Sequence, residues 1–385
     1  MAAVRTAIKG GKVVTPLEVF EPGDVLVEDG KIVAVGPAVA AGERGEVIDA
    51  SGLIVAPGYV DVHVHGSAGH DTMDGTREAI AGMAKFFATR GVTSFCPTTL
   101  TVRAEAIMAS VQAVYDCQQD PPEGARPLGV HLEGPYIDKG KKGAQPEQHV
   151  RTASVGDYKG FFSLGNIRAI TFAPEIEENR ELIAFARSRG AAAVVGHSSA
   201  SYEQVAEAVK LGLNHATHTF NQMEGLHHRK PGTVGAVLLL DGIYAEFIAD
   251  GVHLHPAIVD MIVRLKGPDK ALAITDAISG AGMPDGVYDL GGQKVLVKEG
   301  AVRLEDGTLA GSCLTLDQAV RNIAKFTGRR LGECIQMATL TPARSIGVAD
   351  HKGSLERGKD ADIVILTPDL QVKATMVMGK VVYRA

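Results

Sequence analysis

The chain has 385 residues, of which 45% are apolar and 22% charged, and its formal net charge is −6. An acidic balance without a block of Lys and Arg argues against a nucleic-acid surface as its main purpose. No stretch reaches the roughly 20 apolar residues of a membrane span, and the first residues form no hydrophobic signal core, so export is not expected. Scattered cysteines without a CxxC pair favour reduced thiols and a cytoplasmic protein: Cys96, Cys117, Cys313 and Cys334.

Short strands are predicted at both ends of the chain. Asp29-Gly30 supplies a tight hairpin turn near the N-terminus. Neither end alone buries a useful core, so we expect both to pair in one small β-sandwich domain, residues 1–54 with 351–385. The predicted strands are residues 7–14, 24–28, 31–35 and 47–49, then 362–366 and 375–383, the last broken by a turn at 378–380.

Between these ends, short apolar runs alternate with amphipathic helical stretches, a pattern typical of βα units and a parallel sheet. The pattern predicts an α/β fold, a TIM-type (β/α)8 barrel over residues 55–350, with a hairpin inserted at 294–305. A doubly wound sheet is the alternative, but no Gly-rich phosphate fingerprint follows the first strand. The predicted strands are residues 60–65, 93–97, 128–133, 169–173, 192–197, 215–218, 245–250 and 272–276, and the predicted helices are 77–89, 104–117, 178–189, 201–211 and 256–265.

Side chains that can bind metal follow these strands one after another. His63 and His65 lie two apart on the first strand, so both imidazoles face the same side. In a parallel barrel, functional groups gather at the carboxyl ends of the strands, and structural residues alone would rarely place so many such side chains there. The residues at this rim are His63, His65, Glu133, His197, His218, Asp250 and Asp276.

This set predicts metal-assisted hydrolysis. Imidazoles with one carboxylate suit Zn²⁺ or Fe²⁺ with a position left open for water, whereas Mg²⁺ or Ca²⁺ would require more oxygen ligands. Such a metal lowers the pKa of its water towards ~7 and polarises a carbonyl group. Asp276 is the best candidate for the carboxylate that accepts the water's proton and returns it to a leaving amine.

Six ordered motifs resemble the amidohydrolase superfamily. HLEGP together with the His-Thr-Phe-Asn run is similar, more narrowly, to the N-acetylglucosamine-6-phosphate deacetylases. The resemblance spans nearly the whole chain. The motifs are PGYVDVHVHG at 57–66, HLEGP at 131–135, GHS at 196–198, ATHTFNQM at 216–223, ADGVH at 249–253 and TDA at 275–277.

The resemblance implies roles for individual residues. Glu133, His197 and His218 would hold the main catalytic metal, and Asp276 would be the acid/base. His63 and His65, with Glu133 bridging, would form a second metal position that only some members possess. Residues 173–175 read Ala-Pro-Glu, so the carboxylated lysine of urease- or dihydroorotase-like branches is absent. The positions that match substrate-binding residues are Ala144, Asn221, Gln222, Arg229, His253, Leu309, Ala310 and Gly311.

Four further positions are not assigned to the metal or to the substrate. Some members carry a His at the position of Gln145 that polarises the substrate carbonyl. Gln can donate a hydrogen bond but carries no charge, so whether Gln145 takes part in catalysis stays open. We expect His131 and Asp61 to support the site, and His215 to be either a core residue or a supporting one.

The implied activity is removal of the acetyl group from N-acetyl-D-glucosamine 6-phosphate, with one or two divalent cations per subunit. Zn²⁺ is the first expectation and Fe²⁺ the alternative. The galactosamine epimer or an N-acyl amino acid stay open as substrates, and an inactive scaffold is the alternative of another class. Related deacetylases are typically dimers, so we expect a homodimer; whether Arg229 acts in its own subunit or across the dimer stays open.

Overall fold

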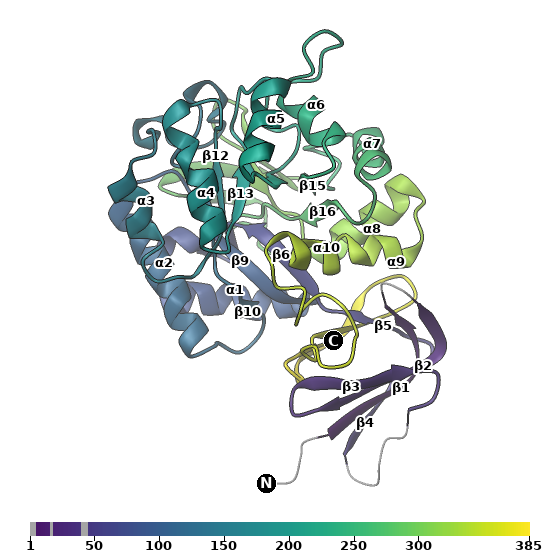
Figure 1. Ribbon diagram of the computed structural model, residues 1–385. Coiled ribbons are helices and arrows are strands. Elements are labelled where there is room, and N and C mark those ends of the chain that lie inside the picture. Colours follow the sequence, from purple (N-terminus) through teal and green to yellow (C-terminus); the bar gives the residue numbers. More distant parts are fainter. Residues whose placement is uncertain (1–4, 16–17, 40–44) are drawn as a thin grey trace.

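The computed structural model describes residues 5–15, 18–39 and 45–385. It consists of the predicted parallel barrel with one mixed sheet, built from the N- and C-terminal strands, beside it (Figure 1). The barrel strands, all within the described residues, are hydrogen-bonded in chain order, and short β10 (Arg126–Pro127) adds to the edge of β9. They are β6 (Tyr59–Val64), β9 (Val92–Thr99), β11 (Val130–Glu133), β12 (Ile167–Phe172), β13 (Ala192–Val195), β14 (His215–Ala216), β15 (Tyr244–Ile248) and β16 (Ala271–Ile274).

Helices cover the outside of the barrel (Figure 1). The five predicted helices are confirmed, although the fourth barrel helix begins with a 3₁₀ turn at Glu177–Asn179. Ser201 caps its helix as expected, because its side chain accepts the backbone N–H of Gln204. The confirmed helices are α1 (Arg77–Thr89), α2 (Ala104–Gln119), α4 (Glu181–Ser188), α5 (Tyr202–Leu211) and α7 (Pro256–Lys266).

Five helices were not predicted. Residues 232–238 of α6 are all buried, so this helix is apolar on every side and shows no helical periodicity. In the described part of the chain, no helix is both long and apolar enough to cross a membrane. The unpredicted helices are α3 (Val155–Phe161), α6 (Gly232–Leu239), α8 (Leu316–Thr327), α9 (Leu331–Gln336) and α10 (Leu340–Ser345).

The first and last barrel strands close the barrel through a few contacts. At the carboxyl end, the N–H of Asp276 donates to the carbonyl of His63 at 2.9 Å. At the opposite end, residues 337–338 lie between β6 and β16, and their carbonyls accept N–H groups from both strands. The closure therefore ties the HxH strand directly to the segment that carries Asp276.

The N- and C-terminal strands meet in one continuous mixed sheet on one side of the barrel (Figure 1). Their predicted pairing is confirmed, and unpredicted β5 joins the two sets by pairing with β1 and β21. Buried side chains such as Ile8, Val25 and Ile363 give the sheet its own core, which supports the proposed domain 1–54 with 351–385. Residues 1–4, 16–17 and 40–44 of that domain lie outside the described residues. The strands are β1 (Arg5–Val14), β2 (Val19–Glu28), β3 (Lys31–Gly36), β4 (Glu46–Asp49), β5 (Ile54–Pro57), β21 (Ile363–Leu366), β22 (Val372–Val377) and β23 (Lys380–Arg384).

A small antiparallel sheet is inserted after the eighth barrel strand. It contains the predicted hairpin and lies over the rim, because the Gln293 amide donates to the carbonyl of Ala144 at 2.6 Å. The N–H of Ser312 donates to the carbonyl of Asp276 at 2.7 Å. Its strands are β17 (Gly286–Leu290), β18 (Gln293–Lys298), β19 (Ala301–Arg303) and β20 (Leu309–Ser312); the short pair β7 (Gly66–Ser67) and β8 (His70–Asp71) follows the first barrel strand.

Candidate metal centre and substrate pocket

Most rim residues lie just beyond the ends of the strands, where the chain leaves the sheet, whereas His63 and Glu133 lie within β6 and β11. His65 follows β6 directly, and His197, His218 and Asp276 each lie two residues after their strands. The last three have φ values of 48°, 21° and 50°, in the left-handed region that non-glycine residues rarely adopt. The predicted strands were therefore slightly too long here, because this backbone geometry ends the pairing. Such strain is concentrated at functional sites.

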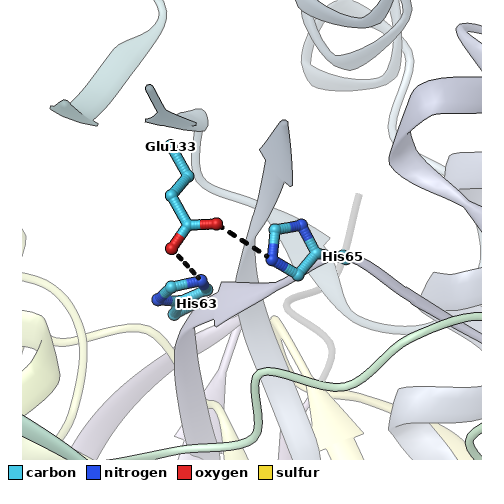
Figure 2. Close-up of side chains that lie close together, drawn as sticks. All are labelled: His63, His65 and Glu133. Carbon is cyan, nitrogen blue, oxygen red and sulfur yellow. Dashed lines mark ion pairs between the residues drawn. The ribbon is translucent and has the colours of Figure 1, made fainter. Parts of the chain in front are cut away.

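Glu133 lies at the centre of the cluster. Its side chain is buried, and its Oε1 lies 3.0 Å from Nε2 of His218, 3.3 Å from Nε2 of His197 and 3.4 Å from Nε2 of His63. Oε2 lies 3.3 Å from Nε2 of His65. Figure 2 shows the carboxylate facing both imidazoles of the HxH strand. One carboxylate thus joins two candidate metal groups, Glu133 with His197 and His218, and Glu133 with His63 and His65.

The hydrogen bonds of these histidines fit metal ligation through Nε2. Nδ1 of His65 lies 3.2 Å from a carbonyl oxygen at the end of β9, and Nδ1 of His197 lies 2.8 Å from one in the loop after β11. A carbonyl oxygen only accepts, so each Nδ1 donates its proton there and each Nε2 is the nitrogen left to bind a metal. In the described part of the chain, the buried Nε2 of His63 has no hydrogen-bond partner. The donor set and this unsatisfied nitrogen fit a divalent cation.

The charges inside the rim favour a cation. Burial alone would lower the pKa of His63, but Glu133, Glu246 and Asp276 outweigh it and raise this pKa to about 9. Burial opposes ionisation of Glu133, yet His63 and the neighbouring imidazoles hold its pKa well below the usual range. Buried carboxylates that stay ionised create a negative potential at the point where the imidazole nitrogens converge.

Asp276 lies beside the HxH pair. Its Oδ1 is 3.2 Å from Nε2 of His65 and 3.6 Å from Nε2 of His63. Gly311 packs against this residue with φ 67°, and a Cβ there would lie 2.8 Å from the carbonyl oxygen of Asp276, so a larger residue would displace the strand end.

Asp61 lies behind the cluster as expected, accepting the hydroxyl of Thr275 at 2.6 Å and the N–H of His63 at 3.3 Å.

A pocket of about 500 Å³, including space open to solvent, leads to this cluster. Asp276, Glu133 and the imidazoles other than His63 line its floor, and Leu100 and Leu290 add apolar wall. Ala310 is not among its lining residues; its side chain is buried in the core of the inserted sheet. Gln145 also lines the pocket, with these predicted substrate residues: Ala144, Asn221, Gln222, His253, Leu309 and Gly311.

Comparisons with known proteins agree with this geometry. A model of the amidohydrolase family matches residues 54–382. The chain is 39% identical over 363 residues to the N-acetylglucosamine-6-phosphate deacetylase of Lysinibacillus sphaericus, an alignment covering 94% of this chain and 93% of that protein. The chain belongs to the amidohydrolase family, among the N-acetylglucosamine-6-phosphate deacetylases.

Two further comparisons concern the fold and the substrate specificity of related deacetylases. The crystal structure of N-acetylglucosamine-6-phosphate deacetylase from Thermotoga maritima superposes with a TM-score of 0.90 at 38% identity, covering 98% of this chain and all of that one. The N-acetylgalactosamine-6-phosphate deacetylase of Escherichia coli O157:H7 is 37% identical over 357 residues, covering 92% of this chain and 93% of that protein. Identity to this chain therefore does not separate the two epimeric specificities.

The amide of Gln145 is already engaged in this deacetylase-family chain. Its Nε2 donates to Oε2 of Glu133 at 2.6 Å, and its Oε1 accepts the N–H of Thr101 at 2.7 Å. Gln145 thus holds the carboxylate at the centre of the metal cluster.

Arg229 lies apart from the pocket-lining residues. It is exposed and lies shortly before α6. The segment that leads into α6 projects from the barrel next to α5 and α6 (Figure 1). Its Nη1 lies 2.6 Å from Nε2 of His228. The structure therefore brings the other polar substrate residues, but not Arg229, to the pocket of the same subunit.

Asp250 has a different place from the metal-cluster residues. Its Oδ1 accepts the N–H groups of Val252 and His253 at 2.8 Å, and its Oδ2 lies 2.7 Å from Nδ1 of His253. Asp250 therefore orients the pocket-lining His253.

Sequence reasoning missed Glu246, a fully buried carboxylate on β15. The available signal was a charged residue flanked by Ala245 and Phe247 within an apolar strand. His215 is a buried partner of this carboxylate, at 3.0 Å. His131 uses both ring nitrogens on protein groups, the carbonyl of Val62 and the hydroxyl of Thr171, and so has no free nitrogen for a metal.

Proposed function

We propose that this protein hydrolyses the acetamide of N-acetyl-D-glucosamine 6-phosphate to D-glucosamine 6-phosphate and acetate. The observation that carries the proposal is the position of Glu133, which lines the pocket and whose carboxylate faces four imidazole Nε2 atoms. Similarity to deacetylases over nearly the whole chain supports this substrate class.

Glu133, His197 and His218 are proposed to hold the main metal, and His63 and His65, with Glu133 shared, a second one. Zn²⁺ is the proposed ion and Fe²⁺ the alternative, because both accept imidazole and carboxylate ligands. When bound, the metal polarises the acetamide carbonyl and lowers the pKa of water.

The chain's own residues would then orient the substrate and move the proton. Asp276 accepts the proton released as water adds to the carbonyl carbon, and it returns that proton to the amine nitrogen as the C–N bond breaks. Gln145 keeps Glu133 in place. Asn221, Gln222 and His253 are proposed to bind the sugar phosphate, and Ala144, Leu309 and Gly311 to line the space for the sugar and acetyl group.

The galactosamine epimer is the second candidate substrate, supported by the Escherichia coli relative. An N-acyl amino acid is less well supported, because its smaller amine would leave the sugar-phosphate residues unused. An inactive scaffold is disfavoured, because Glu133, His197, His218 and Asp276 are all present and assembled around one pocket.

The test is acetate release by purified, metal-analysed protein from the two epimeric N-acetylhexosamine 6-phosphates and from N-acetyl amino acids. We expect bound Zn²⁺ or Fe²⁺ and the highest kcat/KM with the glucosamine compound. A higher kcat/KM with the galactosamine epimer would establish the second candidate. Failure of metal-loaded protein to release acetate from every compound would reject the proposal.

We also propose that the protein is a cytoplasmic homodimer in which Arg229 reaches the substrate phosphate of the partner subunit. The exposed position of Arg229, away from its own pocket, supports this arrangement. The free cysteines, of which Cys96, Cys117 and Cys334 are buried, suit a reducing compartment.

A further inference from the structure

Glu246 is a carboxylate inside the barrel to which sequence analysis gave no role. It lies on β15 beneath the rim, and its side chain is fully buried. Burying a charged carboxylate costs free energy unless the group is paired and hydrogen-bonded. The groups that contact Glu246 therefore indicate its role.

One oxygen of Glu246 serves several groups at once. Oε2 lies 3.0 Å from Nδ1 of His63, accepts the hydroxyl of Thr217 at 2.9 Å and accepts the backbone N–H of His218 at 3.1 Å. Oε1 lies 3.0 Å from Nε2 of His215. The carboxylate thus touches His63 from the second candidate metal group and His218 from the first.

The contact with His63 determines which ring nitrogen is free. A carboxylate can only accept, so Nδ1 of His63 carries the proton and donates it to Glu246. Nε2 is then the nitrogen left to bind a cation, in exchange for any proton that it carries, and this buried atom lies 3.4 Å from Oε1 of Glu133. A carboxylate that holds the far nitrogen of a histidine fixes its tautomer and ring orientation and strengthens it as a ligand.

Glu246 contacts His218 through the backbone and not through the imidazole. Glu246 holds its backbone N–H, at a residue whose φ is 21°, and leaves its ring free. Loss of the carboxylate charge therefore acts on the His63 imidazole directly, but on the His218 imidazole only through the backbone.

Resting on the function proposed above, we propose that Glu246 is a positioning residue that controls occupancy of the second metal position through His63. The first position keeps Glu133, His197 and His218, so it depends on Glu246 much less. The carboxylate thereby decides whether a subunit works with one metal or with two.

The test measures Zn²⁺ dissociation constants of the full-length protein by competition with a chromophoric chelator. The parent should show two constants, and the variant with His63→Asn and His65→Asn identifies the one that belongs to the second position. Glu246→Gln should weaken that constant by about 10–100-fold and shift the other less than a few-fold. A parent with one constant, unchanged constants, or an equal shift of both constants in Glu246→Gln would overturn the proposal.

Two further variants separate positioning from general damage. Asp317→Asn removes another buried, ion-paired carboxylate, on α8 and away from the pocket, and should change neither constant. Thr217→Val removes one hydrogen bond to Glu246 while keeping its charge, and it also removes the contact of the Thr217 hydroxyl with Nδ1 of His63 at 2.8 Å; it should weaken the same constant by a smaller factor. If Glu246→Gln does not fold, unchanged constants in Thr217→Val would reject the proposal.

These constants are measured without substrate. A parent that binds two Zn²⁺ ions but releases no acetate would reject the proposed function while leaving the role of Glu246 intact. If the parent protein releases acetate but the Zn²⁺ constants of Glu246→Gln equal those of the parent, the proposed function stands and the role of Glu246 is rejected.

Discussion

The amide of Gln145 and the carboxylate of Glu133 form a 2.6 Å hydrogen bond at the floor of the pocket. The same Glu133 oxygen lies 3.3 Å from Nε2 of His65. The other end of the Gln145 amide is held by the N–H of Thr101. Gln145 therefore commits one of its two amide N–H groups to the metal cluster, so the role expected first is to hold Glu133.

Gln145→Leu should consequently reduce metal binding. Removing one partner leaves a buried acceptor of Glu133 unsatisfied, at a cost of about 1–3 kcal/mol, and excess Zn²⁺ should restore most of kcat. Metal titration and steady-state kinetics check this, with Gln112→Leu on the exposed face of α2 as the control. Unchanged metal affinity with kcat still low at saturating Zn²⁺ would instead assign Gln145 to the substrate carbonyl.

The barrel and most rim positions could be predicted because apolar strands end on polar residues in a regular order. Glu133 and His197 each follow such a run, and parallel strands bring their ends together. The exact strand ends could not be predicted, because the left-handed backbone at His197, His218 and Asp276 depends on tertiary contacts.

The features that sequence reasoning missed share a physical cause. Glu246 is polar but lies inside the barrel, where a strand pattern predicts only apolar side chains. α6 is buried on all sides, so periodicity was absent. Residues 337–338 complete the barrel closure through backbone carbonyls, which no side-chain pattern reveals. Each depends on packing between segments far apart in the chain.

Asp276→Asn should remove nearly all turnover while metal stays bound. The amide cannot accept and return a proton, and such groups contribute roughly 10²–10⁴-fold. Acetate release and metal content measured on the same sample check this, with exposed Asp306→Asn as the matched control. Near-parental kcat in a metal-loaded variant would exclude Asp276 as the acid/base.

The double variant His63→Asn with His65→Asn should bind close to one metal per subunit. Its remaining cluster keeps Glu133, His197 and His218, whereas the parent should bind up to two. Elemental analysis after saturation and removal of free metal gives the stoichiometry. Should the double variant retain as much metal as the parent, the HxH pair has only a structural role.

Substrate without the phosphate should be hydrolysed much less efficiently. Hydrogen bonds to charged groups contribute about 1.5–3 kcal/mol each, and binding energy far from the reacting bond helps to orient the amide. We expect kcat/KM for N-acetylglucosamine to fall by at least about tenfold per lost contact.

Arg229→Ala should lower kcat/KM for the phosphorylated substrate only, and Lys230→Ala in the same loop serves as the control. Equal kcat/KM for both compounds would contradict phosphate recognition.

The exposed position of Arg229 leads to a prediction about assembly. In a symmetric dimer its contact with the partner's substrate would be reciprocal, giving two equivalent composite sites. Asp276→Asn and Arg229→Ala subunits, each weakly active alone, should therefore regain activity when mixed. One site of each heterodimer collects both defects and the other is intact, so an equal, fully exchanged mixture should approach about a quarter of parental activity.

The control for this experiment is subunit exchange, followed by native mass spectrometry of differently tagged chains. Mixing each variant with itself should restore nothing. If heterodimers form and activity stays at the level of the separate variants, Arg229 serves its own barrel, because every site then keeps one defect. If the chain stays monomeric at assay concentrations, the composite site is excluded, and Arg229 can reach the phosphate only by movement of its own loop. Neither result would alter the chemistry assigned to Asp276, since that residue acts within the barrel that carries it.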